Sequence, residues 1–239
     1  MANTNIVAAG KIFDVGSRVV LWDEETGLSF YKRAMKYAGR DDSFDELSTK
    51  MNCFVIHHAA SWTAKTTYNG LVGRGLSCNF IIDDDDVNGV ATIYQCLDIK
   101  DAGYSHKPLN MAGPGVEIAY QPTAWSMPNA YSPLNVQKMG LQPHTTVDDT
   151  VHGVKKRVYA PTDAQINACI NLIWGFLELF PAVESSFPRD AQGNISKTTV
   201  KNPKGLLAHF HITGEKVDPY GFPFDMVEKE VKAKSTWGY

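Results

Sequence analysis

The sequence lacks the features of several large protein classes. It has no run of about 18 uninterrupted apolar residues and no basic start followed by a long apolar block, so it predicts neither a membrane span nor a secretory signal. It has no excess of positive charge, because the formal net charge is −3, which argues against nucleic acid as a partner. No GxxxxGK sequence follows a predicted strand, so a P-loop nucleotide site is excluded. We expect synthesis in the cytoplasm without a signal peptide.

Cysteine is also scarce. The four cysteines lie far apart, with no CxxC pair among them: Cys53, Cys78, Cys96 and Cys169. Three of them lie in apolar, strand-like runs, and Cys169 lies on the apolar face of a predicted helix. We therefore expect buried free thiols, with a disulfide framework as the weaker alternative.

What is present is the composition of an ordinary globular protein. Of the 239 residues, 44% are hydrophobic and 21% are charged, which is enough for one large core. We predict a single α/β (α+β) domain with a central mixed β-sheet flanked by helices. Residues 1–50 are expected to form an N-terminal extension packed on the core of the main domain, 51–226, and 227–239 a C-terminal helix and tail. Residues 121–160, rich in Pro, Asn, Ser and Thr, are expected to form a long surface loop.

Local patterns place the main elements. Apolar runs predict strands at 17–22, 53–57, 115–120 and 206–208, and a hairpin over 79–96 that turns at Asn88-Gly89. A capping box formed by Thr162 and Gln165 opens the clearest helix, which Pro181 ends. Shorter helices are expected at 29–37, within 61–77 and at 225–235.

Two polar features of the predicted loops are interpreted as solvent-exposed. Within and after the run Asp83 to Asp86, a calcium loop is matched in its first half by Asp84, Asp86, Asn88 and Gly89, but Gln95 occupies the position that needs a bidentate Glu, and strands instead of helices flank the loop. We therefore interpret the run as a solvated hairpin turn. His144 and His152 lie in the 121–160 segment and are expected at the surface.

Two short segments carry clusters of metal-binding side chains. CFVIHHAAS ends a buried strand in His57 and His58, which point to opposite sides, so only one of them should be a ligand. AHFHITGEKVDP offers His209, His211 and Asp218, and the two histidines share a side if the chain there is extended. Imidazole nitrogens and a carboxylate oxygen are the usual protein ligands of a catalytic zinc. A zinc site could therefore use His57, His209 and either His211 or Asp218.

Glu117 is the candidate proton acceptor. It lies in VEIAY, where one strand face carries Val, Ile and Tyr and the other carries Glu and Ala. A strand this apolar is rarely half exposed, so Glu117 is expected to face a cleft, where its carboxylate could accept a proton from zinc-bound water. The alternative is a structural ion pair with a nearby Lys or Arg. Lys216 and Asp218 share one side of an extended chain, and a surface ion pair is the alternative for them.

Taken in order, these motifs resemble the zinc-dependent N-acetylmuramoyl-L-alanine amidases, a family that includes amidase-type phage lysozymes and is related to peptidoglycan recognition proteins. The similarity covers roughly residues 50 to 226 and rests on VIHHAAS, CNFIIDDDDVNGVATIYQC, DAGYSH, GVEIAY, PTDAQINACINLI and AHFHITGEKVDP. The resemblance implies one Zn²⁺ per chain, with His57, His209 and Asp218 as ligands. It also implies that Glu117 and Lys216 are the catalytic groups.

The resemblance further implies substrate contacts from His106, which ends DAGYSH, and from Asn79, which stands where the family often has a histidine. His211 stands where an acidic residue is common, so it could support the metal ligands from behind or compete as a ligand. The implied reaction is hydrolysis of the amide between the lactyl group of N-acetylmuramic acid and L-alanine, with peptidoglycan or a muropeptide as substrate.

Three biological roles are compatible with this resemblance. We expect first a monomeric phage endolysin, which is synthesised in the host cytoplasm and acts on the cell wall or periplasm after release or transport. A cytoplasmic amidase that recycles wall fragments is the close alternative. A non-catalytic peptidoglycan-binding module is the third, and it is disfavoured because all of the expected ligands and the expected base are present.

Overall fold

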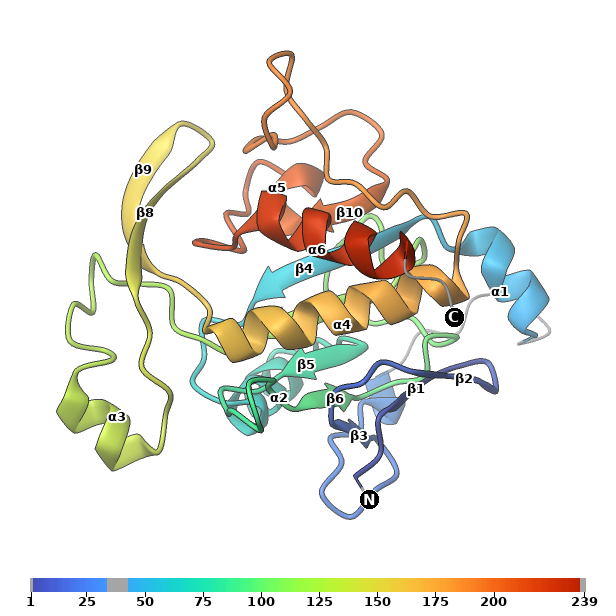
Figure 1. Cartoon of the computed structure of the whole chain (residues 1–239), viewed down its shortest axis with the longest axis horizontal. Coiled ribbons are helices and arrows are strands. Elements are labelled where there is room, and N and C mark those ends of the chain that lie inside the picture. The colour runs from blue at the N-terminus through green and yellow to red at the C-terminus, as the bar shows by residue number, and fades with distance from the viewer. Residues whose placement is uncertain (1, 34–42, 237–239) are drawn as a thin grey trace.

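A mixed six-stranded sheet forms the centre of the protein. The computed structural model describes residues 2–33 and 43–236 (Figure 1). The strands follow the order β10-β4-β7-β5-β6-β3, and β5 and β6 run antiparallel while the other neighbours run parallel. Their bounds are β3 (Val19–Leu21), β4 (Cys53–His58), β5 (Phe80–Ile82), β6 (Ile93–Gln95), β7 (Gly115–Ile118) and β10 (Gly205–Ala208). The predicted fold class is confirmed.

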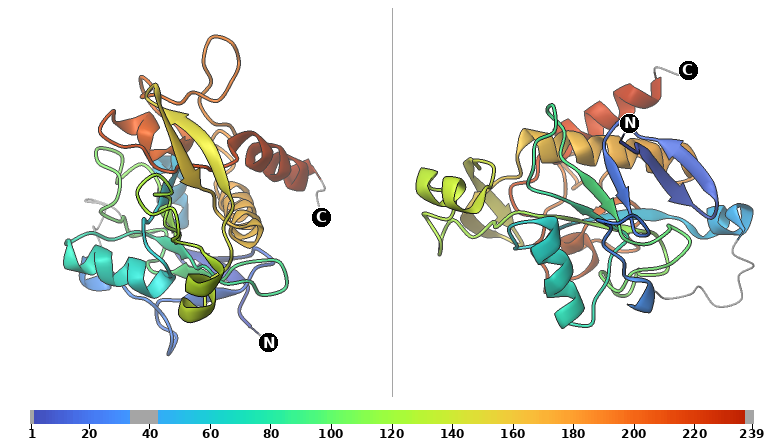
Figure 2. Two further views of the ribbon diagram at one scale, coloured as in Figure 1. Left: turned by 90° about the vertical axis from the view of Figure 1, so that its left-hand side faces the viewer. Right: turned by 90° about the horizontal axis from the view of Figure 1, so that it is seen from below.

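Helices cover both faces of this sheet. α4 (Asp163–Leu179) and α6 (Phe224–Thr236) pack on one face, and α2 (Ala64–Gly73) lies on the other (Figure 2). Phe54 and Ile56 belong to the core beneath α4, whereas Ile81 packs with Leu71 of α2. Because both faces are covered, most residues of the central strands are apolar on both sides of the sheet instead of alternating regularly with polar residues. None of the helices in the described ranges is long and apolar enough to span a membrane.

The cap of α4 fixes its start against the sheet. Thr162 Oγ1 accepts from the Gln165 amide at 3.2 Å, and Gln165 Oε1 accepts from the Thr162 amide at 3.1 Å, as the capping box predicts. The Gln165 side chain also donates to Ala119 O at 2.7 Å and to Asp83 O at 3.0 Å. The helix therefore begins where β5 and β7 end, and it closes at Phe180 before Pro181.

The N-terminal segment contributes to both the sheet and the core. β1 (Asn5–Ala8) and β2 (Lys11–Asp14) form a hairpin, and β3 adds an edge strand beside β6. The helix expected over 29–37 is described only as the 3₁₀ turn η1 (Tyr31–Arg33), and 34–37 lie outside the described residues. α1 (Phe44–Lys50) was not predicted, although Ser43 and Glu46 carry its capping signal.

The prediction that 121–160 form a long loop is wrong, because the segment contains one helix and two strands. It contains α3 (Pro133–Met139) and a hairpin of β8 (Thr146–Val151) and β9 (Val154–Tyr159). The hairpin turns at His152 and Gly153, whose φ angles of 50° and 76° suit a two-residue turn. Most side chains of β8 and β9 are polar and not buried, so the apolar alternation that marks a half-buried strand is missing.

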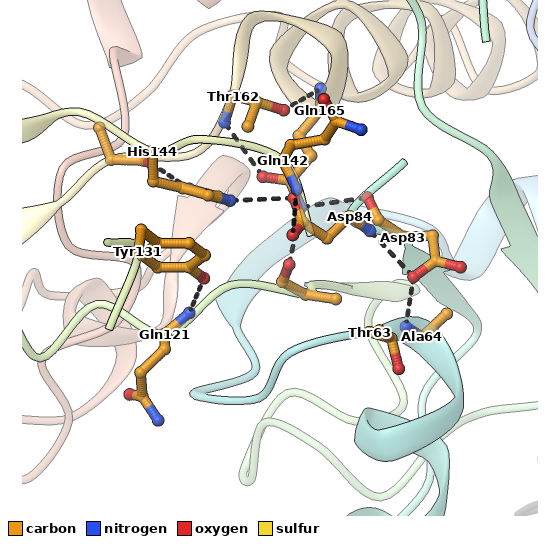
Figure 3. Close-up of polar contacts among 12 residues, drawn as sticks. Thr63, Ala64, Asp83, Asp84, Gln121, Tyr131, Gln142, His144, Thr162 and Gln165 are labelled. Carbon is orange, nitrogen blue, oxygen red and sulfur yellow. Dashed lines mark hydrogen bonds and ion pairs between the residues drawn. The ribbon is translucent and has the colours of Figure 1, made fainter. Parts of the chain in front are cut away.

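The acidic turn is not fully solvated, which corrects a second expectation. Asp84 and His144 are both buried, and Asp84 Oδ1 lies 2.9 Å from His144 Nε2 (Figure 3). His144 Nδ1 donates to Ala160 O at 2.7 Å, and Asp84 Oδ2 accepts from the Gln142 amide at 3.2 Å. The His144 ring packs on Tyr131 with 4.0 Å between ring centroids. This pair joins the 121–160 segment to the sheet.

We expect Asp84→Ala to lower the free energy of unfolding by about 3–5 kcal/mol, because it removes the buried carboxylate that pairs with His144 and accepts from the Gln142 amide. Urea unfolding of both proteins measures the loss. Asp86→Asn is the matched control in the same turn, since Asp86 is exposed, and its effect should stay within about 0.5 kcal/mol. Equal losses in the two variants would show that the buried pair does not stabilise the fold.

The cysteine prediction is confirmed. Cys53, Cys78, Cys96 and Cys169 are all buried and free. Burial raises the pKa of Cys53 to about 12, so the thiol stays protonated and unreactive. The four side chains therefore act as small apolar residues of the core.

Candidate metal and catalytic site

The site lies where two neighbouring parallel strands end. β4 and β10 pair in parallel with Ile56 opposite Ala208, so His57 and His209 follow at the same edge of the sheet. β10 stops at Ala208 because α5 (His209–Ile212) begins at the next residue. The carboxyl ends of parallel strands are the usual location of functional sites in such sheets. This topology brings together two segments that are about 150 residues apart in the sequence.

Three side chains converge at this edge. His57 Nδ1 lies 3.0 Å from His209 Nδ1 and 2.9 Å from Asp218 Oδ2. His209 Nδ1 lies 3.1 Å from the same carboxylate oxygen. Asp218 comes from the loop after α5, where its carbonyl oxygen accepts from the Phe210 amide at 3.3 Å. These residues form a group that could hold a metal ion.

The donor set fits zinc. Burial lowers the pKa of His57 to about 4, so its ring is neutral at neutral pH and can offer a lone pair. Burial alone would raise the pKa of Asp218, but hydrogen bonds from His209 and His57 hold it well below its usual range. Ligand atoms about 2.0–2.1 Å from a tetrahedral zinc lie roughly 3.3 Å apart, close to the spacing found here. Two nitrogens and a carboxylate oxygen are also the donors that zinc accepts.

His58 points away from the cluster, as strand alternation requires. Its Nδ1 accepts from the Tyr220 amide at 2.9 Å, and its ring stacks on Tyr220 with 6.0 Å between centroids. The structure therefore places His57, and not His58, beside His209 and Asp218.

His211 also lies outside the cluster, because the chain at 209–212 is helical, and the extended conformation that would place His209 and His211 on one side is not formed. The two residues lie on the short helix α5, where positions two apart are rotated by about 200°. His211 Nδ1 accepts from the Ala208 amide at 2.9 Å, and its Nε2 donates to Ser196 O at 2.7 Å. Both ring nitrogens are thus engaged in holding the start of α5.

Glu117 lies on β7, directly opposite His57 in the register of neighbouring strands. Only 8% of the residue is exposed. Burial, followed by the charge of Asp218, raises the pKa of its carboxyl to about 8, and the charges of Arg74 and Lys216 oppose this shift. A carboxyl whose pKa lies near the working pH is suited to accept and then donate a proton.

A groove of about 750 Å³ adjoins the cluster. His209, Lys216 and His106 all line it, and Lys216 is exposed. The His106 ring is buried and stacks on His57 with 5.7 Å between centroids. Its Nδ1 lies 2.7 Å from Ser105 Oγ, and its Nε2 lies 3.2 Å from Gly113 O. His106 therefore forms part of the wall between the groove and the ligand cluster.

Asn79 occupies a different place from the one expected of a substrate contact. Its side chain is completely buried, and its amide nitrogen donates to Asp101 O at 2.8 Å and to Asp98 O at 3.4 Å. The side chain therefore holds the 98–101 turn, and it does not line the groove. His152 was expected at the surface and is half-buried there, and its ring reaches the loop that carries Lys216. No sequence signal links residues 152 and 216.

These features define a mixed α/β protein with a candidate metal site at the carboxyl ends of parallel strands. The sequence profile of the N-acetylmuramoyl-L-alanine amidase family matches residues 47–221, and the chain belongs to this family. No curated protein matches the chain.

Solved structures with a similar chain include three proteins. AmpDh3 from Pseudomonas aeruginosa in complex with anhydromuramic pentapeptide is 18% identical with a TM-score of 0.48, and the match covers 76% of this chain and 60% of that one. The endolysin N-acetylmuramoyl-L-alanine amidase LysCS from Clostridium intestinale is 15% identical with a TM-score of 0.44, covering 78% and 86%. The ectodomain complex of peptidoglycan recognition proteins LCa and LCx bound to tracheal cytotoxin is 11% identical with a TM-score of 0.44, covering 88% and 95%. The chain thus spans about three fifths of the AmpDh3 chain.

Proposed function

We propose that this protein is a zinc-dependent amidase that hydrolyses the bond between the lactyl group of N-acetylmuramic acid and L-alanine in peptidoglycan. Membership of the amidase family supports the substrate class. The observation that carries the zinc-dependent chemistry is the convergence of His57, His209 and Asp218 within 2.9–3.1 Å. A buried glutamate on the adjacent strand supplies the proton acceptor that this hydrolysis needs.

Each group has a distinct task in this proposal. His57, His209 and Asp218 would hold Zn²⁺, which when bound supplies a Lewis acid that polarises the scissile carbonyl and acidifies a water molecule. Glu117 accepts a proton from the attacking water and then delivers it to the amine nitrogen of L-alanine as the C–N bond breaks. The Lys216 ammonium stabilises the negative charge on the carbonyl oxygen, a role worth about 3 kcal/mol per donor. His106 keeps the His57 ring in place by stacking on it.

The biological role that we propose is lysis of the bacterial wall by a monomeric phage endolysin. A recycling amidase would carry the same catalytic groups and differ in its substrate, since it would act on soluble wall fragments instead of the intact polymer. A binding module would hold peptidoglycan without cutting it. The three roles therefore differ in what the protein does to intact wall and to soluble muropeptides.

Mass spectrometry of digested cell wall tests the reaction. The purified, zinc-loaded protein should release peptides with a new L-alanine amino terminus and leave the glycan strands uncut. Parallel digestion of intact wall and of soluble anhydro-muropeptides separates lysis from recycling. New reducing sugar ends, or intact wall after incubation with protein that holds zinc, would contradict the proposal.

A further inference from the structure

The β8–β9 hairpin lies against the segment that carries Lys216 and Asp218 (Figure 2). We propose that the hairpin braces this segment, and that His152 and Asp149 are positioning residues for Lys216 and Asp218. Neither side chain touches the reacting atoms, so each would act through the backbone that it holds. The effect on catalysis rests on the proposed function. That the hairpin holds the segment rests on the hydrogen bonds that His152 and Asp149 make.

The first anchor is His152 at the tip of the hairpin. Its Nε2 donates to Lys216 O at 2.9 Å. Its backbone amide donates to Lys197 O at 2.9 Å, and its ring meets the Phe210 ring edge to face. The backbone bond to Lys197 and the ring contact with Phe210 therefore hold His152 at the hairpin tip, with one ring nitrogen directed at the Lys216 carbonyl.

The second anchor is Asp149 on β8. Its Oδ2 accepts from the Gly221 amide at 2.9 Å, and its Oδ1 lies 3.1 Å from Lys197 Nζ. A hydrogen bond to an ionised carboxylate is stronger than one between neutral groups. The Lys197 ammonium also lies 4.6 Å from the centroid of the Phe224 ring, which ties the anchor to α6.

The two anchors bracket Asp218. Lys216 precedes it by two residues and Gly221 follows it by three. Gly221 has φ of 67°, and a Cβ there would come within 3.1 Å of Ala160 Cα and Tyr159 O, so the segment passes directly against the end of β9. The chain on both sides of the proposed ligand is thus held by the 121–160 segment.

The loop before Asp218 depends on the hairpin because its own hydrogen bonds are short-range. The Lys216 amide donates to Thr213 O at 3.3 Å, and the Glu215 amide to Thr213 Oγ1 at 3.4 Å. Residues 214–217 are exposed. The bond from His152 therefore links this loop to a distant part of the fold, 64 positions away in the sequence.

This link bears on the chemistry through Lys216. The Lys216 side chain lines the groove beside His209, and its charge acts on Glu117 and His57. If the backbone at 216 shifts, the ammonium moves relative to the reacting carbonyl, and small displacements of such groups lower the rate. We expect kcat to fall while KM changes little, because ground-state binding uses the rest of the groove.

Three substitutions test the brace. His152→Asn keeps a residue that tolerates positive φ, but its amide nitrogen lies one bond closer to Cβ than His Nε2. His152→Gln places an amide nitrogen the same number of bonds from Cβ and can restore the donor. We expect kcat to fall about five- to tenfold in His152→Asn and to recover in His152→Gln. Val154→Ala, at the exposed side of the same tip, is the control and should match the wild type.

A double substitution isolates the effect that passes through Lys216. In a Lys216→Ala background, His152→Asn should cause no further loss of kcat, because the group that it positions is gone. Additive losses in the double variant would overturn the role assigned to His152.

Hydrogen exchange of the full chain tests the brace without any activity. At millisecond labelling times, amides of 213–217 should exchange faster in His152→Asn than in the wild type and in Val154→Ala. Unchanged exchange would overturn the brace even if the enzyme is active. If the wild type cleaves no amide at all, the proposed function fails, and the exchange result alone decides whether the hairpin holds the loop.

Discussion

Glu117→Gln is expected to lower kcat for amide hydrolysis by about 10²–10⁴-fold while zinc stays bound, because the amide cannot accept the proton of the attacking water. Gln is close to Glu in size, and Glu117 is not one of the three converging side chains, so the metal site should be retained. Release of new amino groups from purified wall measures the rate, and metal analysis measures zinc. Glu184→Gln is the control, since Glu184 is exposed and paired with Lys204. Full activity in Glu117→Gln would assign the base to another residue.

The same substitution should change how stability depends on pH in the metal-free protein. Burial raises the pKa of Glu117 from 4.5 to about 8, so between these values the folded state keeps a proton that the unfolded state has lost. The free energy of unfolding therefore contains a contribution that is complete below about pH 4.5 and is lost as pH rises through about 8. Glu117→Gln should remove this loss, which urea unfolding at pH 5 and pH 9 would detect as a flatter profile. A profile unchanged from the wild type would mean that the carboxyl is ionised at neutral pH.

Asp218→Ala is expected to lose zinc and activity together, whereas His211→Ala should keep both. Asp218 supplies one of the three converging atoms, and losing a ligand should weaken zinc affinity by more than about 100-fold, the upper range for residues that only support ligands. His211 uses both ring nitrogens on Ala208 N and Ser196 O. Chelator competition with zinc-loaded protein measures the affinities.

The control variant His211→Ala should itself be less stable than the wild type. His211→Ala removes the partners of a buried amide and a buried carbonyl, so it should lower the free energy of unfolding by about 2–4 kcal/mol. Zinc content per folded chain must therefore be measured below the unfolding transition. Zinc loss in His211→Ala with zinc retained in Asp218→Ala would make His211 the third ligand.

Local sequence signals predicted the framework of the site well. The apolar runs at β4, β7 and β10 and the capping box of α4 depend on nearest neighbours along the chain, and each element formed where it was expected. The hairpin β8–β9 was missed because most side chains of its strands are polar and not buried, so the strands lack the apolar alternation by which a sequence pattern is recognised. The buried pair of Asp84 and His144 was missed for the same reason, since 60 positions separate the two residues.

The sequence by itself determined the candidates for chemistry: histidines at the end of a buried strand, a second cluster of histidine, lysine and aspartate, and a glutamate in an apolar strand. Only the tertiary structure decided among them. Parallel pairing of β4 with β10 brings His57 and His209 together, and the start of α5 turns His211 away from Asp218. The physical reason is that a strand or helix forms largely according to the pattern of residues next to it in the chain. The convergence of the ligand atoms depends instead on the order of the strands in the sheet and on where a helix begins.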